Sequence, residues 1–362
     1  MSISRSDGDT RRAALERGPH GLRLRGRSCG GGTESGAQAL VAGVVFDRAM
    51  SQLGWIRDRP RTFAFPRSVK RIDRALSNYG DEERDPRAVR LNEGLEALPT
   101  ECLYGSCVAR VYLSDSVREI CESAFCFCKR LSLVEIAGTS RLEVIGKNAF
   151  GHTAIEAFAA PKGLRRIGAG AFAGCGDLTR LDLNEGLEEL GVQEQTLDGL
   201  RYRMYGAFEE TALEEFVAPT GLTAIAQEAF LGCKGLRRVT LNEGLEALGT
   251  EERNQYGERL LGAFQDSGVR EVRLPRTLRE IRYAAFKGCG DLAGVLLPEG
   301  LRVIGEEAFS RSELRTLALP EGLVVTGGEA FYRCAALGAV AVPEGSALEE
   351  VGSQAFAGTG IG

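Results

Sequence analysis

One stretch of the sequence decides the fold: Leu292-Ala-Gly-Val295-Leu-Leu297-Pro298-Glu-Gly300-Leu301-Arg-Val-Ile304-Gly305-Glu-Glu-Ala308-Phe309. The same pattern of residue types recurs along the chain, and each copy ends in an Ala-Phe pair. The phenylalanine of that pair stands at residues 125, 150, 172, 208, 230, 264, 286, 309, 331 and 356, and Cys102-Leu103 fills the same place one step earlier. Successive copies lie 22–25 residues apart, except for steps of 36 and 34 residues that end at Phe208 and Phe264. A fixed period of this length predicts a repeat solenoid.

Each copy divides into four parts. The Leu-x-x-Val-x-Leu part ends in alternating apolar and exposed positions, which is typical of a strand. Pro298-Glu-Gly300, or Asn-Glu-Gly in other copies, predicts a type II turn in which glycine takes a positive φ. A second short extended segment reaches Ile304, and Gly305-x-x-Ala308-Phe309 predicts a tight helical or 3-10 corner that turns the phenylalanine inward.

A unit of 22 residues cannot cover its own apolar face, so it must stack on its neighbours. Stacked strands lie about 4.8 Å apart, which would place the phenylalanine rings in a continuous interior ladder. We therefore predict a right-handed leucine-rich-repeat β-solenoid with a parallel sheet. Its strands should be centred near Val111, Val134, Ala157, Leu181, Phe216, Val239, Val272, Val295, Leu317 and Val340.

A second pattern concerns the residue three places after each phenylalanine. Hydroxyl and thiol side chains alternate there without a break, at Ser106, Cys128, Thr153, Cys175, Thr211, Cys233, Ser267, Cys289, Ser312, Cys334 and Thr359. Cysteines two coils apart are roughly 9.5 Å apart, too far for a disulfide, so they should be small buried hydrophobes. For the N-terminal group, which is Cys102, Cys107, Cys121, Cys126 and Cys128, a single disulfide and a structural zinc both stay open.

The repeat resembles that of a known family. Segments such as Leu278-Arg-Glu-Ile281, Ala285-Phe286, Cys289, Leu292 and Val295 match the BspA-type (treponemal-type) leucine-rich repeat nearly position for position. The resemblance covers residues 91–362. It implies a curved solenoid with its parallel sheet on the concave side, used for recognition and often for adhesion, and it implies no enzyme activity.

The chain divides into three regions. Residues 1–61 form a basic leader that we expect to be disordered, 62–90 a degenerate N-terminal cap repeat, and 91–362 the array, with insertions at 191–206 and 249–262. Residues 1–90 carry a net charge of about +7 and the rest about −12. An acidic body argues against nucleic-acid binding. The longest apolar run, Ala39 to Phe46, is too short to span a membrane.

The sequence shows none of the usual signatures of catalysis. It has 2 histidines, and neither a Ser-His-Asp arrangement nor a phosphate-binding glycine loop is recognisable. We therefore expect no enzyme activity, no catalytic residue, no cofactor and no metal. The favoured function is a monomeric scaffold that binds a protein partner in the cytoplasm, because no secretion signal is visible. A cell-surface adhesin is the alternative, an organelle-targeted protein is another location, and a regulatory subunit of an enzyme is a third possibility.

Two surfaces are candidates for binding that partner. One is the pair of insertions, which are rich in the tyrosine and arginine that often anchor interfaces: Arg201, Tyr202, Arg203, Tyr205, Arg253, Tyr256 and Arg259. The other is the concave sheet face, where outward positions hold Arg180, Asp182, Glu215, Arg238, Glu271 and Arg273. Toward the C-terminus this face becomes a small apolar strip. The sequence leaves open which surface binds.

Overall fold

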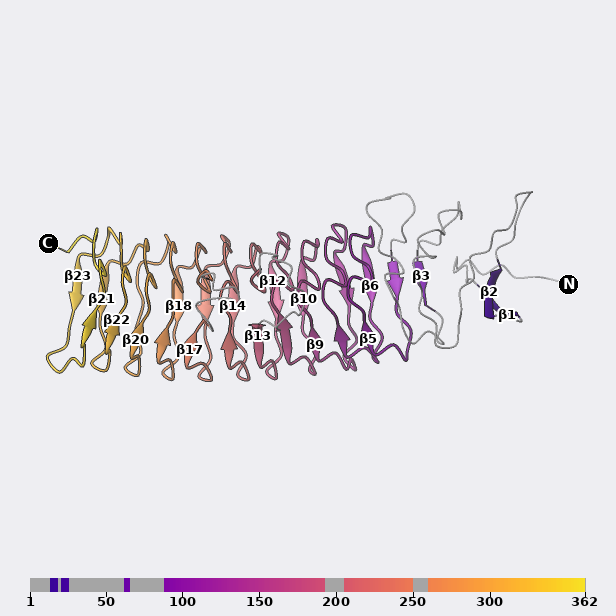
Figure 1. Cartoon of the computed structure of the whole chain (residues 1–362), viewed down its shortest axis with the longest axis horizontal. Coiled ribbons are helices and arrows are strands. Elements are labelled where there is room, and N and C mark those ends of the chain that lie inside the picture. Colours follow the sequence, from indigo (N-terminus) through magenta and orange to yellow (C-terminus); the bar gives the residue numbers. More distant parts are fainter. Residues whose placement is uncertain are drawn as a thin grey trace.

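The computed structural model describes residues 62–65, 88–192, 205–249 and 260–361, and the backbone of 14–18 and 21–25. The array is a single stack of coils that runs along the long axis of the molecule (Figure 1). Strands of successive coils pair in parallel, as predicted. In the leader, β1 (Ala14–Gly18) and β2 (Gly21–Arg25) form an antiparallel hairpin. The rest of the leader lies outside the described residues.

Each full coil except the one around Val295 contributes one strand to the first sheet. These strands are β3 (Thr62–Ala64), β4 (Ala88–Arg90), β6 (Arg110–Tyr112), β8 (Leu133–Glu135), β10 (Ala157–Ala159), β12 (Arg180–Asp182), β14 (Glu215–Val217), β16 (Arg238–Thr240), β18 (Glu271–Arg273), β21 (Thr316–Ala318) and β23 (Ala339–Ala341). Eight predicted centres are confirmed. The strand expected at Ala157 is centred on Phe158, and no strand forms around Val295. β3 pairs with β4 and so extends the sheet into the predicted cap region.

The second extended segment of each coil builds a second parallel sheet. Its strands are β5 (Ala97–Leu98), β7 (Glu119–Ile120), β9 (Val144–Ile145), β11 (Arg166–Gly168), β13 (Glu189–Val192), β15 (Ala224–Ile225), β17 (Ala247–Leu248), β19 (Glu280–Ile281), β20 (Val303–Ile304), β22 (Val325–Thr326) and β24 (Glu350–Val351). They form runs of six and five strands. The core lies between the two sheets.

The predicted phenylalanine ladder fills that core. Rings of neighbouring coils stack from Phe125 to Phe356, with centroids 4.9–5.5 Å apart. All but the last are completely buried. Because each ring between the two ends of the ladder has a ring on both sides, apolar burial and aromatic stacking act together along the stack.

The corners are not helical, which corrects our expectation. The described corners contain turns only, with no α- or 3-10 helix. Around Phe125, Ser123 and Phe127 have positive φ values of 55° and 60°. Their N–H groups and that of Phe125 each donate a 2.8 Å hydrogen bond to the next coil. A helical turn would use these donors within its own coil, whereas alternating left- and right-handed residues free every second N–H to link the coils.

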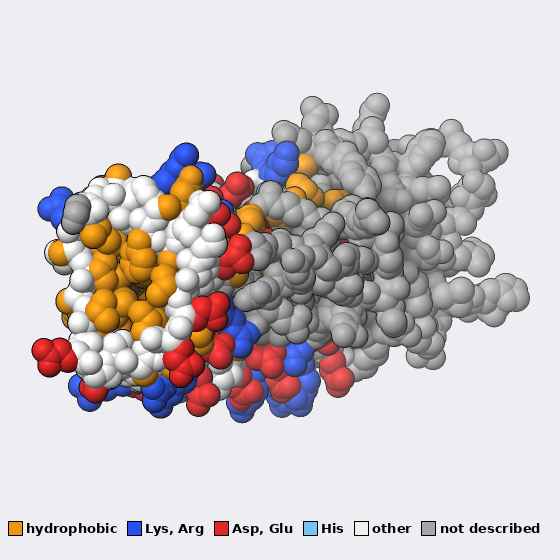
Figure 2. Space-filling view, turned by 60° about the vertical axis from the view of Figure 1, so that its left-hand side comes forward, with side chains coloured by type: hydrophobic (Ala, Val, Ile, Leu, Met, Phe, Trp, Pro, Cys, Tyr) orange, Lys and Arg blue, Asp and Glu red, His pale blue; other side chains and the backbone are white. Residues whose placement is uncertain are grey.

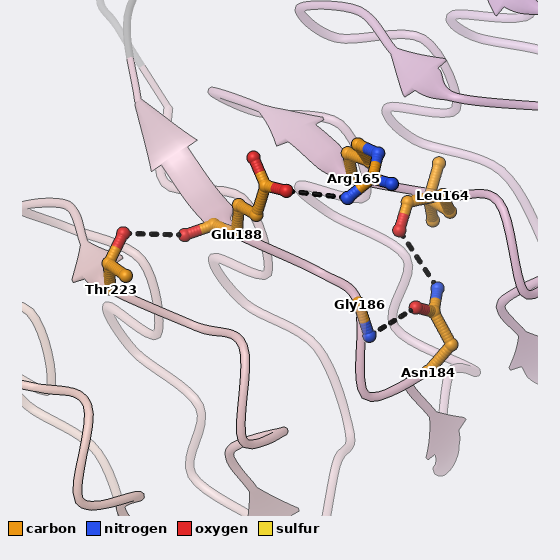
Figure 3. Close-up of polar contacts among 6 residues, drawn as sticks. All are labelled: Leu164, Arg165, Asn184, Gly186, Glu188 and Thr223. Atoms are coloured by element: carbon orange, nitrogen blue, oxygen red, sulfur yellow. Dashed lines mark hydrogen bonds and ion pairs between the residues drawn. The ribbon is translucent and has the colours of Figure 1, made fainter.

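The turns between the two sheets also differ from the prediction. Among the Asn-Glu-Gly and Pro-Glu-Gly glycines, only Gly94 has a positive φ, 96°. At Gly300 the reason for glycine is close approach, since an added Cβ would lie 3.0 Å from the carbonyl oxygen of Arg276. Asparagine links two coils here: the Asn184 amide donates to the carbonyl of Leu164 at 2.9 Å (Figure 3). The same amide also donates to the carbonyl of Pro161 at 2.8 Å.

The thiols and hydroxyls meet in pairs. Each ladder cysteine lies 3.2–3.5 Å from the hydroxyl of the preceding coil, as in Thr153–Cys175 and Thr211–Cys233. Its Sγ also donates to a carbonyl of the preceding coil, which belongs to Leu103 for Cys128 and to a phenylalanine for the other four, at 2.9 Å in the case of Cys233. Burial raises the pKa of Cys233 to about 11 and that of Cys289 to about 12. The predicted sheltered thiols are confirmed by their burial.

Candidate functional site on the first sheet and the insertion edge

The outward face of the first sheet carries the six charged residues predicted for it. Arg180 and Asp182 lie on β12, Glu215 on β14, Arg238 on β16, and Glu271 and Arg273 on β18; all six are exposed. Strand pairing places Glu215, Arg238 and Glu271 side by side in one column. The structure thus brings these six residues to one face.

The charges in this column alternate. Arg238 Nη2 lies 3.1 Å from Glu215 Oε2, with 60% and 46% of the side chains exposed. The hydrogen bond and the positive charge of Arg238 lower the pKa of Glu215 below its ordinary value. Such an exposed pair contributes little to stability. It does fix the charge pattern that the face presents to a partner.

Beyond β18 the same face becomes apolar and flat. The two outward positions of successive coils are Gly294 and Leu296, then Thr316 and Ala318, then Ala339 and Ala341. Leu296 is 89% exposed, whereas a Cβ added to Gly294 would meet nothing within 4 Å. A large apolar side chain therefore stands beside an open position.

The insertions leave the second-sheet edge at two equivalent glycines. Gly191 and Gly249 both have positive φ, 75° and 93°. The chain returns at Gly206 and Gly262, where an added Cβ would lie only 1.6 and 1.7 Å from a carbonyl oxygen of the next coil. Both insertions are therefore anchored in the same way.

A buried acceptor completes each anchor. The N–H of Gly206 donates to Glu209 Oε2 at 3.0 Å, and that of Gly262 donates to Gln265 Oε1 at 3.1 Å. Most of the predicted loop residues lie outside the described residues, namely Arg201, Tyr202, Arg203, Arg253, Tyr256 and Arg259. Their role stays a prediction.

Tyr205 is the one predicted loop residue that the structure describes. Its ring lies 6.0 Å from that of His152, edge to face, and His152 stacks on Phe127 at 4.6 Å. Tyr104 contacts the other side of Phe127 at 5.6 Å. Sequence reasoning missed this aromatic row, although Phe127 and His152 both stand two places after a ladder phenylalanine. These rings contact one another from coil to coil, so the row braces the corner.

One further apolar surface lies at the C-terminal end of the stack. Figure 2 shows apolar side chains gathered there inside a ring of backbone. Val342, Val351 and Ile361 occupy core positions of the last coil and are 54%, 52% and 44% exposed. Among the described residues, no group of histidine, cysteine or carboxylate side chains could hold a metal ion. The part of the chain that the structure describes also contains no helix suited to crossing a membrane.

The fold defines the class of this protein as a leucine-rich-repeat β-solenoid with exposed sheet faces. The BspA type leucine rich repeat region matches the chain in six copies, over residues 91–194, 204–252 and 261–362, which is well over half of its length. The chain therefore belongs to the BspA-type leucine-rich-repeat family, as the resemblance indicated. No curated protein matches it.

Solved structures show similar chains. A leucine-rich repeat protein from Bacteroides ovatus is 20% identical, with 82% of this chain and 84% of that chain covered and a TM-score of 0.43. A leucine rich cell surface protein from Faecalibacterium prausnitzii is 18% identical, with coverages of 84% and 92% and a TM-score of 0.45. The pneumococcal vaccine antigen PcpA is 17% identical, with coverages of 82% and 76% and a TM-score of 0.45.

These comparisons correct the expected location. We expected a cytoplasmic protein because no secretion signal was visible in the sequence. Homologues in the BspA-type family are cell-surface or secreted proteins. The cytoplasmic expectation was therefore wrong. It rested on the absence of a recognisable signal, which is a weak argument compared with family membership.

Proposed function

We propose that this protein is a non-catalytic recognition protein of the cell surface or the extracellular space, and that it binds a protein partner. Family membership supports the class, since BspA-type proteins serve in protein interaction or adhesion. The mixed charge of the first-sheet face favours a protein over a nucleic acid, because phosphate binding needs clustered positive charge. No cofactor or metal enters the proposal.

One observation favours the first-sheet face as the binding surface. The face that holds Glu215, Arg238 and Glu271 is built in register and exposed, yet its ion pair adds little to the fold. A column of alternating charges of this kind contributes to specificity and to association rate. The insertion edge is a second candidate, since insertions at equivalent points of a solenoid commonly lie on a binding face.

The proposal is tested by capturing partners on the immobilised full-length chain and on two variants. One variant carries Arg238→Glu with Glu271→Arg; the other replaces both insertions by the short Gly-Glu-Glu link of the Phe309 unit. Bound proteins from an extracellular fraction are compared by quantitative mass spectrometry. Proteins bound through either surface should fall at least about tenfold in the corresponding variant.

A matched control uses a similar ion pair on the second-sheet side. Arg118 Nη1 lies 2.6 Å from Glu143 Oε1, and both side chains are about half exposed. Exchanging these two charges should leave capture unchanged. If no captured protein distinguishes the two site variants from this control, neither surface is the binding site and the proposal fails.

A further inference from the structure

The first-sheet face presents two columns of side chains. The first residue of each strand supplies one column and the third residue supplies the other. Three coils show the relation between the columns best. Arg180 stands beside Asp182 on β12, Glu271 beside Arg273 on β18, and Gly294 beside Leu296 two coils before the end of the stack. In each of these coils the second-column residue is the complement of the first.

We propose that a second copy of this chain packs on this face, related by a twofold axis parallel to the long axis of the stack. Such an axis exchanges the two columns and keeps the coils level, so each first-column residue faces the second-column residue of the same coil in the other subunit. Isologous contact of this kind is the commonest way in which identical subunits pair.

Charge complementarity supports the arrangement. Arg180 faces the partner subunit's Asp182, and Glu271 faces the partner subunit's Arg273, while the twofold repeats both pairs in the opposite sense. No like charges face each other in these coils. An antiparallel arrangement of two stacks would instead set the charged half of one face against the apolar half of the other, leaving charged groups without partners.

Shape complementarity supports the same axis. Leu296 is 89% exposed and would face the partner subunit's Gly294, whose α-carbon has open space around it. The leucine of each subunit thus enters the open position of the other. The fold itself gives no reason for glycine at this position, since an added Cβ would touch nothing within 4 Å. Sheets packed face to face normally lie about 10 Å apart.

The two terminal coils extend this contact. Thr316 and Ala318, then Ala339 and Ala341, are small residues that leave the backbone accessible to another sheet. In this contact the exposed leucine would be the anchor, and the small residues around it would let the two sheets pack closely, as at the centres of protein interfaces.

This inference rests on the proposed function in treating the first-sheet face as an interaction surface. It specifies the occupant as a second copy and leaves the insertion edge for other partners. Dimerisation and partner capture are separate measurements. Loss of one without the other therefore separates a failure of this inference from a failure of the proposed function.

The test is sedimentation velocity on the full-length chain over a concentration series that extends to roughly 100 μM, where weak homodimers with micromolar Kd are populated. We expect a monomer–dimer equilibrium. Leu296→Arg and Gly294→Phe should each weaken it at least about tenfold, as loss of a central anchor does. Since neither side chain is used inside the coil stack, circular dichroism and the melting temperature should stay unchanged.

Charge exchange gives the sharper readout. Asp182→Arg alone should weaken the dimer, because it sets Arg180 of each subunit against an arginine. Combining it with Arg180→Asp should restore wild-type association, since the exchanged pair is complementary again across the twofold. A merely structural effect would not be rescued in this way.

Ile361→Arg at the open C-terminal end is the matched control and should leave the dimer intact. A chain that stays monomeric over the whole series overturns the inference. So does a dimer that Ile361→Arg abolishes while Leu296→Arg leaves it unchanged, since that result would place the contact at the end of the stack.

Discussion

Thr326 offers a test of what holds the core together, because it breaks the apolar pattern of its column. Neighbouring coils carry Ile304 and Val351 in the same inward position. Thr326 is completely buried, and its hydroxyl has no hydrogen-bond partner. Burying such a hydroxyl without a partner costs about 1–3 kcal/mol.

We expect Thr326→Val to stabilise the C-terminal coils. Valine has the same branched shape, so it keeps the preferred side-chain rotamer and leaves no cavity. The added methyl is worth about 0.8 kcal/mol in apolar burial, on top of the removed hydroxyl penalty. The two effects together give an expected gain of about 2–4 kcal/mol in the free energy of local unfolding.

Thr211→Val is the matched control, with the opposite sign. The Thr211 hydroxyl is also buried, but it donates to the Phe208 carbonyl at 2.9 Å and lies 3.3 Å from Cys233 Sγ. Losing these contacts should destabilise the coils around it by about 0.5–1.5 kcal/mol.

Both changes are measured by native-state hydrogen exchange, which reports the opening of separate coils, and by urea unfolding followed by circular dichroism. Solenoid coils open locally, so amides of the coil that carries the substitution should respond most. Equal destabilisation by both substitutions would refute the reasoning, because it would mean that the Thr326 hydroxyl contributes favourably despite lacking a partner.

Three further predictions follow from the packing. Gly206→Ala should cost more than about 3 kcal/mol, because the new Cβ meets the Glu228 carbonyl oxygen at 1.6 Å, whereas Gly294→Ala should leave the melting temperature nearly unchanged. Phe230→Ala should cost about 3–5 kcal/mol and Phe356→Ala clearly less, since Phe356 has a ring on one side only; urea unfolding that ranks them equally would argue against the stacking ladder. Buried thiols with raised pKa values favour folding below the ordinary thiol pKa of 9.0, and this contribution is lost as the pH rises from there toward the raised value. Alkaline unfolding should therefore coincide with thiol labelling, and a labelled thiol in the folded protein at neutral pH would contradict the burial of Cys175, Cys233, Cys289 and Cys334.

Much of the site could be placed from the sequence because of strand periodicity. The outward positions of β12 to β18 follow from alternation alone, once the inward positions Leu181 and Val272 are recognised. The sequence did not predict which charged residues form ion pairs with each other. It also did not predict which insertion residues contact a binding protein, since residues in a loop follow no repeat period.

The location could not be predicted from the visible sequence features either. A missing signal says little, and only comparison with the family overturned the cytoplasmic expectation. The aromatic row of Phe127, His152 and Tyr205 was equally hidden, because it forms between coils whose corner residues look unrelated in the sequence.

The sequence by itself determined the stack. A 22-residue period with Leu, Ile, Ala and Phe at fixed places forces each unit to bury its apolar side against the next. It also predicted the alternation of thiols and hydroxyls and the burial of the cysteines, whereas the contacts between thiol and hydroxyl came from the structure.

Only the tertiary structure decided the corners, the turn glycines and the break around Val295. These depend on where each N–H finds an acceptor and on how closely two backbones approach. At the corners the acceptors belong to the next coil, so left-handed residues such as Ser123 are stabilised by a neighbour some 24 positions away, Lys147. At the Gly244 and Gly300 turns, carbonyl oxygens of another coil lie 3.1 and 3.0 Å from where a Cβ would stand, whereas neither glycine has a positive φ. The conformational propensities of a short segment do not predict either contact, because both are made with another coil.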